Sequence, residues 1–111
     1  MASEVTVRLK GIKANGSLHL REVADLLGVG TVDVFRWHTG EETPSPEQAA
    51  RLGTTAELFG RLGELYAPEA ARAWLYSLDV LLDGGCPADH VRAGNVDKVL
   101  GWIAPFEGAR A

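Results

Sequence analysis

The stretch from Ser45 to Tyr66, SPEQAARLGTTAELFGRLGELY, contains the clearest helix signal in the chain. Ser45 offers a hydroxyl N-cap, Pro46 suits the first helical position, and the side chain of Gln48 can bond back to the cap. The apolar residues that follow are spaced on one helical face: Ala49, Leu52, Ala56, Phe59, Leu62 and Tyr66. Glycines, each costing about 1 kcal/mol relative to Ala in a helix, indicate close packing against another backbone: Gly53, Gly60 and Gly63.

Shorter helices are expected before this segment. Residues 5–12 fit either a short strand or one face of a helix, and we favour the helix. A second helix carries Leu20, Val23, Ala24 and Leu27 on one face; His19 or Ser17 caps its start, and Gly28 ends it. Thr31 can cap a third helix that runs through Val34, Phe35 and Trp37 to His38 and stops at Gly40.

The segment from Leu20 to Trp37 has the spacing of a helix-turn-helix unit. Such a unit needs a small residue in its first helix, a turn residue that tolerates positive φ, and an apolar anchor in its second helix, which Ala24, Gly28 and Val34 supply in that order. A DNA-binding unit of this kind inserts its second helix into the major groove. The residues closest to bases or phosphates would then be Thr31, Val32, Phe35 and Arg36.

The same spacing also fits a plain corner between two helices, so the pattern leaves both interpretations open. Asp33 counts against DNA because a carboxylate in the groove repels phosphate. Arg36 is the best single candidate for a DNA contact, and Lys10, Lys13 and Arg21 could add phosphate contacts.

Helix signals continue to near the end of the chain. Pro68 opens a helix with Ala71, Trp74 and Leu75, and Ser77 can cap a turn through Leu82. Pro87 begins a short helix to Arg92, Asn95 caps a last one, and Pro105 is expected to end it and leave residues 106–111 as an exposed tail. We therefore expect an all-α fold whose sections 1–44 and 45–111 form one compact unit.

Composition limits the function classes. The chain has 111 residues, of which 46% are hydrophobic and 23% charged, as in a single soluble domain. The net charge is −4, with about +1 in residues 1–40 and −5 in residues 41–111, which argues against coating nucleic acid by bulk attraction. The single cysteine, Cys86, and three dispersed histidines indicate neither a disulfide nor a metal site. We expect no catalytic residues, no cofactor and no membrane segment, and the cytoplasm as the location.

Further landmarks occur in the second half of the chain. They are Ala73-Trp74-Leu75, Leu81, Gly84-Gly85, Pro87-Ala88-Asp89, Val91, Gly94 and Val99-Leu100. Before them come Glu22-Val23-Ala24, Arg36-Trp37 and Thr39-Gly40. In these landmarks the chain from Leu18 to Ile103 resembles the Xre/MbcA/ParS antitoxin family.

The resemblance implies an antitoxin whose N-terminal section is a helix-turn-helix and whose C-terminal helices bind a toxin. The partner implied is a RES-domain toxin, which consumes NAD by phosphorolysis, hydrolysis or ADP-ribosyl transfer. The antitoxin would keep NAD out of that active site and repress its own operon, as a homodimer or as a hetero-oligomer with the toxin. Under this hypothesis the toxin contacts are Trp74, Trp102, Pro105, Phe106 and Arg110, with the tail as a plug. The alternative is a stand-alone helix-turn-helix regulator.

Overall fold

The computed structural model describes residues 3–77 and 85–109, and the regular elements within them are seven helices. These are α1 (Glu4–Asn15), α2 (Leu20–Leu27), α3 (Thr31–Thr39), α4 (Pro46–Leu65), α5 (Pro68–Leu75), α6 (Pro87–Arg92) and α7 (Val96–Ala109). The prediction of an all-α fold is confirmed for this part of the chain, and residues 5–12 form the helix that we favoured. None of the described helices is both long enough and apolar enough to cross a bilayer.

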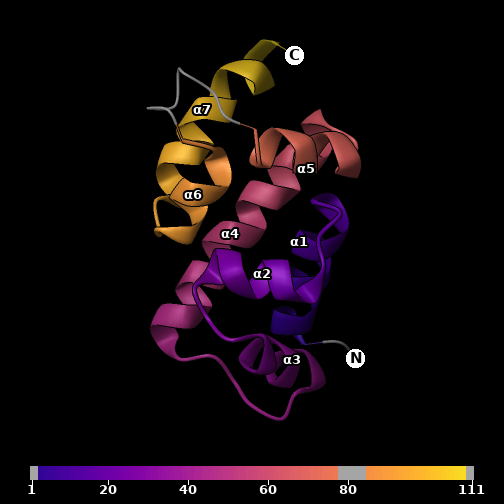
Figure 1. Cartoon of the computed structure of the whole chain (residues 1–111), viewed down its shortest axis with the longest axis vertical. Coiled ribbons are helices and arrows are strands. Elements are labelled where there is room, and N and C mark those ends of the chain that lie inside the picture. Colours follow the sequence, from indigo (N-terminus) through magenta and orange to yellow (C-terminus); the bar gives the residue numbers. More distant parts are fainter. Residues whose placement is uncertain (1–2, 78–84, 110–111) are drawn as a thin grey trace.

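Helix α4 is the axis of the fold and crosses much of the molecule (Figure 1). It begins with the predicted capping box: Ser45 Oγ accepts a hydrogen bond from Gln48 N–H at 3.2 Å, and Gln48 Oε1 accepts one from Ser45 N–H at 2.8 Å. Its 20 residues span about 30 Å, which is enough for α1, α2, α5 and α7 all to pack against it.

Two of the three glycines in α4 lie against side chains of α1, and not against its backbone as the sequence predicted. A Cβ atom at Gly63 would lie 3.0 Å from the side chain of Asn15, and one at Gly53 would lie 3.3 Å from Arg8 Nη1. Gly60 has nothing within 4 Å of that position, so the expectation of close packing is wrong there.

One hydrophobic core joins the two halves of the sequence. Its largest fully buried side chains come from α1, α2, α3, α4, α5, α6 and α7: Leu9, Ile12, Val23, Leu26, Val34, Leu52, Leu58, Phe59, Leu62, Leu75, Val91 and Ile103. The molecule is elongated and measures 40 × 29 × 23 Å along its principal axes. Its two ends are therefore distinct surfaces.

Helix α3 starts differently from the prediction. Its N-cap is Gly30, and Thr31 is already the first helical residue. The carboxylate of Asp33 accepts a hydrogen bond from Gly30 N–H at 3.2 Å, so the third helical residue supplies the cap that we assigned to the Thr31 hydroxyl.

Helix α7 continues past Pro105, so the prediction that regular structure ends there is wrong. A proline inside a helix removes one backbone hydrogen bond, but the last turns gain a long-range anchor. Arg61 of α4 forms an ion pair with Glu107, and its Nε lies 3.0 and 2.9 Å from the two carboxylate oxygens. Arg110 lies outside the described residues, as does the turn that we expected over residues 78–82.

Candidate interaction surfaces

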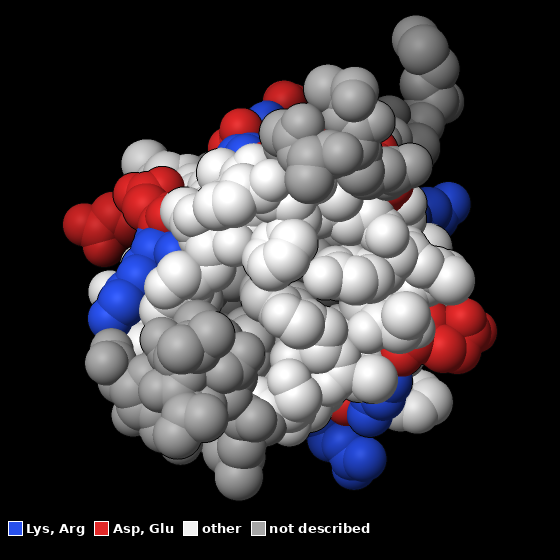
Figure 2. Space-filling model, turned by 90° about the horizontal axis from the view of Figure 1, so that it is seen from above, with Lys and Arg blue, Asp and Glu red and all other residues white. Residues whose placement is uncertain are grey.

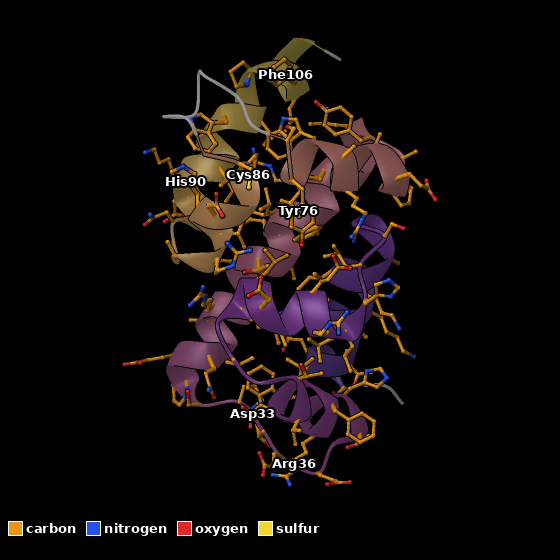
Figure 3. The ribbon with its side chains drawn as sticks, in the orientation of Figure 1. Asp33, Arg36, Tyr76, Cys86, His90 and Phe106 are labelled. Carbon is orange, nitrogen blue, oxygen red and sulfur yellow. The ribbon has the colours of Figure 1, made fainter. Side chains whose placement is uncertain are left out.

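The residues singled out from the sequence lie at opposite ends of the long axis. Figure 3 shows Phe106 at one end, and Asp33 and Arg36 at the other. Helices α5 and α7 reach the first end, and α3 occupies the second (Figure 1). The structure therefore separates the two groups of candidate contact residues into two surfaces.

Helix α7 carries two aromatic side chains that are at least partly exposed, Trp102 and, at the first end, Phe106 (Figure 3). The Phe106 side chain is 55% exposed. One turn earlier, Trp102 is half-buried; the His90 ring packs edge-on against it at 4.8 Å between centroids, and Lys98 Nζ lies 5.6 Å from its ring centre. Pro105 is exposed between them. The surrounding contacts hold Trp102 in place but leave part of its ring accessible.

Helix α5 adds a stacked aromatic pair. The rings of Trp74 and Tyr66 lie 6.4 Å apart at an interplanar angle of 21°, and both residues are half-buried. Helical spacing placed Tyr66 on the core face of α4, so its role beside Trp74 was missed. Only the packing of α5 against the end of α4 brings the two rings together. We call Tyr66, Trp74, Trp102 and Phe106 the aromatic surface.

Among the described residues, the end of the molecule that carries Phe106 has few charged side chains at its centre. Figure 2 looks onto this end and shows uncharged atoms across the middle, with Lys, Arg, Asp and Glu side chains near the edges. A centre enriched in aromatic residues and depleted of charge is typical of protein interfaces, which are also rimmed by polar groups. Among the described surfaces, this end is therefore the candidate protein-binding site.

The corner between α2 and α3 has the predicted geometry. Ala24 is 1% exposed, Val34 is fully buried, and Gly28 has a left-handed φ of 72° that ends α2. Gly40 ends α3 in the same conformation, with φ 85°. The pattern read from the sequence therefore correctly predicts the two-helix corner.

Helix α3 presents the predicted contact residues to solvent. Thr31, Val32, Phe35 and Arg36 are all exposed, and Val32 and Phe35 are 59% and 51% exposed. Asp33 is half-buried and accepts a hydrogen bond from Gly30 N–H. It therefore caps the start of α3 and does not extend freely toward a DNA groove. Arg36 Nη1 pairs with Glu42 Oε1 at 3.1 Å, which offsets part of its positive charge.

Cys86 and His19 lie at the starts of helices, where their backbone N–H groups are capped. Cys86 is buried at the N-cap of α6, and its N–H donates to Asp89 at 3.3 Å. His19 precedes α2, and its N–H donates to Glu22 at 3.0 Å. Over residues 3–77 and 85–109, no three side chains of His, Cys, Asp or Glu gather into a possible metal site.

Charged contacts tie the α2–α3 corner to the rest of the molecule. Arg51 of α4 reaches the C-terminal ends of two helices: its Nη2 donates to the carbonyl oxygens of Leu26, Val91 and Arg92 at 3.2, 3.0 and 2.5 Å. Arg72 of α5 pairs with Glu22 of α2 at 2.7 Å, and its hydrogen bond lowers the pKa of Glu22 to about 2. No local pattern in the sequence indicates these contacts, because their partners are far apart in the chain.

Comparison with known proteins identifies similar chains. No protein-family model matches the chain. It is 33% identical over 86 residues to the mycobacterial cidal antitoxin MbcA of Mycobacterium tuberculosis and of Mycobacterium bovis, a match that covers 78% of this chain and 76% of each relative. Its fold is similar to that of a chain in the crystal structure of the M. tuberculosis MbcT–MbcA toxin–antitoxin complex, with a TM-score of 0.77, 29% identity and 91% of both chains covered.

Proposed function

We propose a function for this chain from the premise that it belongs to the family of the antitoxin MbcA. It is an antitoxin, and its partner is a toxin that it binds and neutralises. We assign the partner to the RES-domain toxins, which consume NAD, because the sequence landmarks resemble the antitoxins that are encoded with them. The two proteins meet in the cytoplasm.

The aromatic surface is the proposed toxin-binding site. The exposure of its aromatic side chains is the observation that supports this assignment. Aromatic side chains at the centre of an interface supply most of its binding energy when a partner buries them. Trp74, Trp102 and Phe106 are accessible, and few described charged residues lie at the centre of this end. A partner that buries these rings therefore removes few charged groups from water. Pro105 and Arg110 flank Phe106 in the sequence and complete the set of proposed contacts.

The last turns of α7 are the proposed blocking element. Phe106 lies beside Glu107, whose ion pair with Arg61 fixes this part of the helix to α4. A side chain held on an ordered helix loses less conformational freedom on binding than one on a loose tail. Phe106 therefore enters the mouth of the toxin's active site as a preorganised group and keeps NAD out, with no catalytic residue or cofactor of the antitoxin involved.

A second function, repression of its own operon, is proposed for the α2–α3 corner. The observation in its favour is the joint exposure of Thr31, Val32, Phe35 and Arg36 on the second helix of a correctly formed corner. One small acidic subunit makes few phosphate contacts, so we propose that two copies bind together, as a homodimer or within a complex with the toxin.

Co-expression with the product of the neighbouring gene tests the main proposal. With both proteins present, we expect cellular NAD to stay at the level of cells without the toxin; with the toxin alone, NAD falls. If cellular NAD falls equally with and without this chain, the chain is not an antitoxin of that toxin. If the chain leaves NAD unprotected but binds its own upstream DNA tightly, it is a stand-alone regulator.

A further inference from the structure

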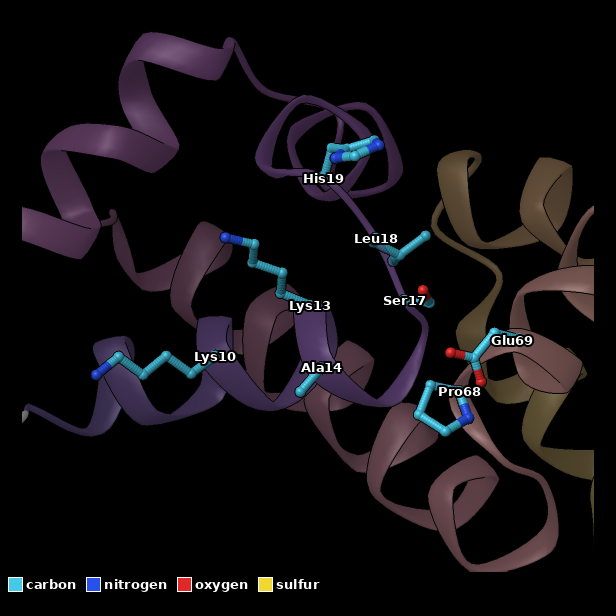
Figure 4. A pocket seen from close by; sticks show the side chains of 8 residues that line it. All are labelled: Lys10, Lys13, Ala14, Ser17, Leu18, His19, Pro68 and Glu69. Carbon is cyan, nitrogen blue, oxygen red and sulfur yellow. The ribbon is translucent and has the colours of Figure 1, made fainter.

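Two surface cavities share the same pair of lysines. The larger, about 570 Å³, lies between α1 and the start of α5, and Figure 4 shows Lys10, Lys13 and His19 among the side chains that line it. The smaller, about 260 Å³, lies toward α3 and is lined by Lys10, Lys13, Phe35 and His38 among others. Lys10 and Lys13 line both cavities, and we call the two neighbouring cavities together the lysine groove.

The lysine groove is basic within an acidic protein. Lys10, Lys13, His19 and His38 line it, and the carboxylate that lines it, Glu69, lies at the end beside α5. Neither lysine forms an ion pair with any described residue. By contrast, most described arginines are paired with carboxylates: Arg8, Arg36, Arg61, Arg72 and Arg92. Two lysines without an ion pair among the described residues therefore lie together in this groove.

The groove opens beside one particular face of α3. Phe35 lines the smaller cavity and is 51% exposed, so this face of α3 continues directly into the two lysines. Arg36 instead pairs with Glu42, and Glu41 follows close by in the sequence. Two carboxylates near Arg36 repel a polyanion, whereas Lys10 and Lys13 attract it. The two sides of α3 thus differ in their fit to a negatively charged ligand.

We propose that the lysine groove holds a phosphate backbone of duplex DNA while α3 enters the adjacent major groove. The inference rests on the proposed operator binding and deepens it, because it assigns the side of α3 on which the backbone lies. Lys10 and Lys13 are three residues apart on one helical face, and each contacts a phosphate. Phe35 lies between that backbone and the base edges, where an aromatic side chain can contact the methyl group of thymine.

Salt dependence of DNA binding tests the assignment. The probe is a labelled duplex of the sequence upstream of the protein's own reading frame, titrated by fluorescence anisotropy between about 50 and about 200 mM salt. We expect Lys10→Gln and Lys13→Gln each to reduce the slope of log K against log salt by about 1, and the double variant by about 2. The matched control is Lys98→Gln on α7, which makes the same change in net charge far from the groove and should keep the wild-type slope. Glu69→Gln should tighten binding.

Every other outcome overturns the inference in an identifiable way. If the two lysine variants keep the slope of Lys98→Gln, DNA binds elsewhere, although operator binding itself stands. If the wild-type protein does not bind the duplex at the lowest salt, both the groove assignment and operator binding fail, while toxin neutralisation is unaffected. If the lysine variants instead lose self-association without any DNA binding, the groove holds the acidic part of a second copy.

Discussion

The two ends of the molecule each expose a phenylalanine to a similar degree, 51% for Phe35 and 55% for Phe106, yet their surroundings are opposite. Phe35 borders a hollow lined by Lys10 and Lys13. The described residues at the end that carries Phe106 are uncharged across its centre (Figure 2). Because both rings are exposed, both are candidate contacts for a partner. The surrounding charge indicates a different kind of partner at each end: the lysines near Phe35 favour a polyanion, and the uncharged surface near Phe106 favours a protein.

A common frame connects these different ends. Helix α4 contacts both α1 and α7, and Arg51 joins the C-terminal carbonyl groups of α2 to those of α6. We propose that sections 1–44 and 45–111 are therefore one cooperative unit, despite their separate functions. The predictions below test how far the two ends depend on each other.

The largest expected effect comes from Arg51. Arg51→Ala removes hydrogen bonds from a charged donor to three carbonyl oxygens, and we expect the free energy of unfolding to fall by about 3 kcal/mol. Urea denaturation followed by tryptophan fluorescence and far-UV circular dichroism should give one coincident transition. Arg51→Lys, which keeps the positive charge, should lower the free energy of unfolding by less than Arg51→Ala. Two separated transitions, or an unchanged midpoint for Arg51→Ala, would show that the halves are independent.

Acid should weaken the ion pair between Glu22 of α2 and Arg72 of α5, and with it the stability that joins the α2–α3 corner to α5. The hydrogen bond from Arg72 lowers the pKa of Glu22 from 4.5 to about 2, so the folded protein binds fewer protons than the unfolded chain between these pH values. The stability that this pair contributes is complete above about pH 4.5 and is lost as the pH falls toward 2. For a partly exposed pair we expect on the order of 1 kcal/mol.

Denaturation of Glu22→Gln as a function of pH measures this contribution. The variant should be less stable than wild type at neutral pH and should lose less stability over the acidic range. Glu41→Gln changes an exposed carboxylate without a described ion pair and is the control. If Glu22→Gln follows the wild-type acid profile, the pair with Arg72 does not join the corner to α5 in solution.

The smallest effect is expected at the end of α7. Glu107→Gln weakens the contact with Arg61 that lowers the pKa of Glu107, so amide hydrogens of residues 106–109 should exchange faster while those of α3 keep their protection. Glu4→Gln removes the comparable pair with Arg8 on α1 and should leave the exchange of residues 106–109 unchanged. Equal exchange in wild type and Glu107→Gln would mean that the helix continues past Pro105 without this anchor.

Local signals in the sequence were sufficient for most of the fold. The capping box at Ser45 and the glycines that end α2 and α3 act through neighbouring residues, so their effect can be read directly. Pro105 misled for the same reason: its local effect is to end a helix, and the opposing contact between Arg61 and Glu107 joins residues distant in the chain.

The functional sites were harder to predict from the sequence than the fold. The exposed residues of α3 follow from helical spacing once the corner is recognised, and Trp102 and Phe106 were singled out through family resemblance. The stacking of Tyr66 on Trp74 and the hollow around Lys10 and Lys13 depend on how α1, α4 and α5 pack. No spacing along the sequence encodes that packing, so the side of α3 that faces the lysines could be seen only in the structure.

One titration of toxin NAD turnover, with wild type, Phe106→Ala and Phe35→Ala, shows whether Phe106 faces the toxin and Phe35 does not. Both substitutions remove an exposed ring, so Phe106→Ala and Phe35→Ala should each change stability by less than about 0.5 kcal/mol. We expect Phe106→Ala to weaken inhibition by about 2 kcal/mol, or about 30-fold, and Phe35→Ala to inhibit like wild type. Full inhibition by Phe106→Ala, or an equal loss in Phe35→Ala, would contradict the assignment of the two ends.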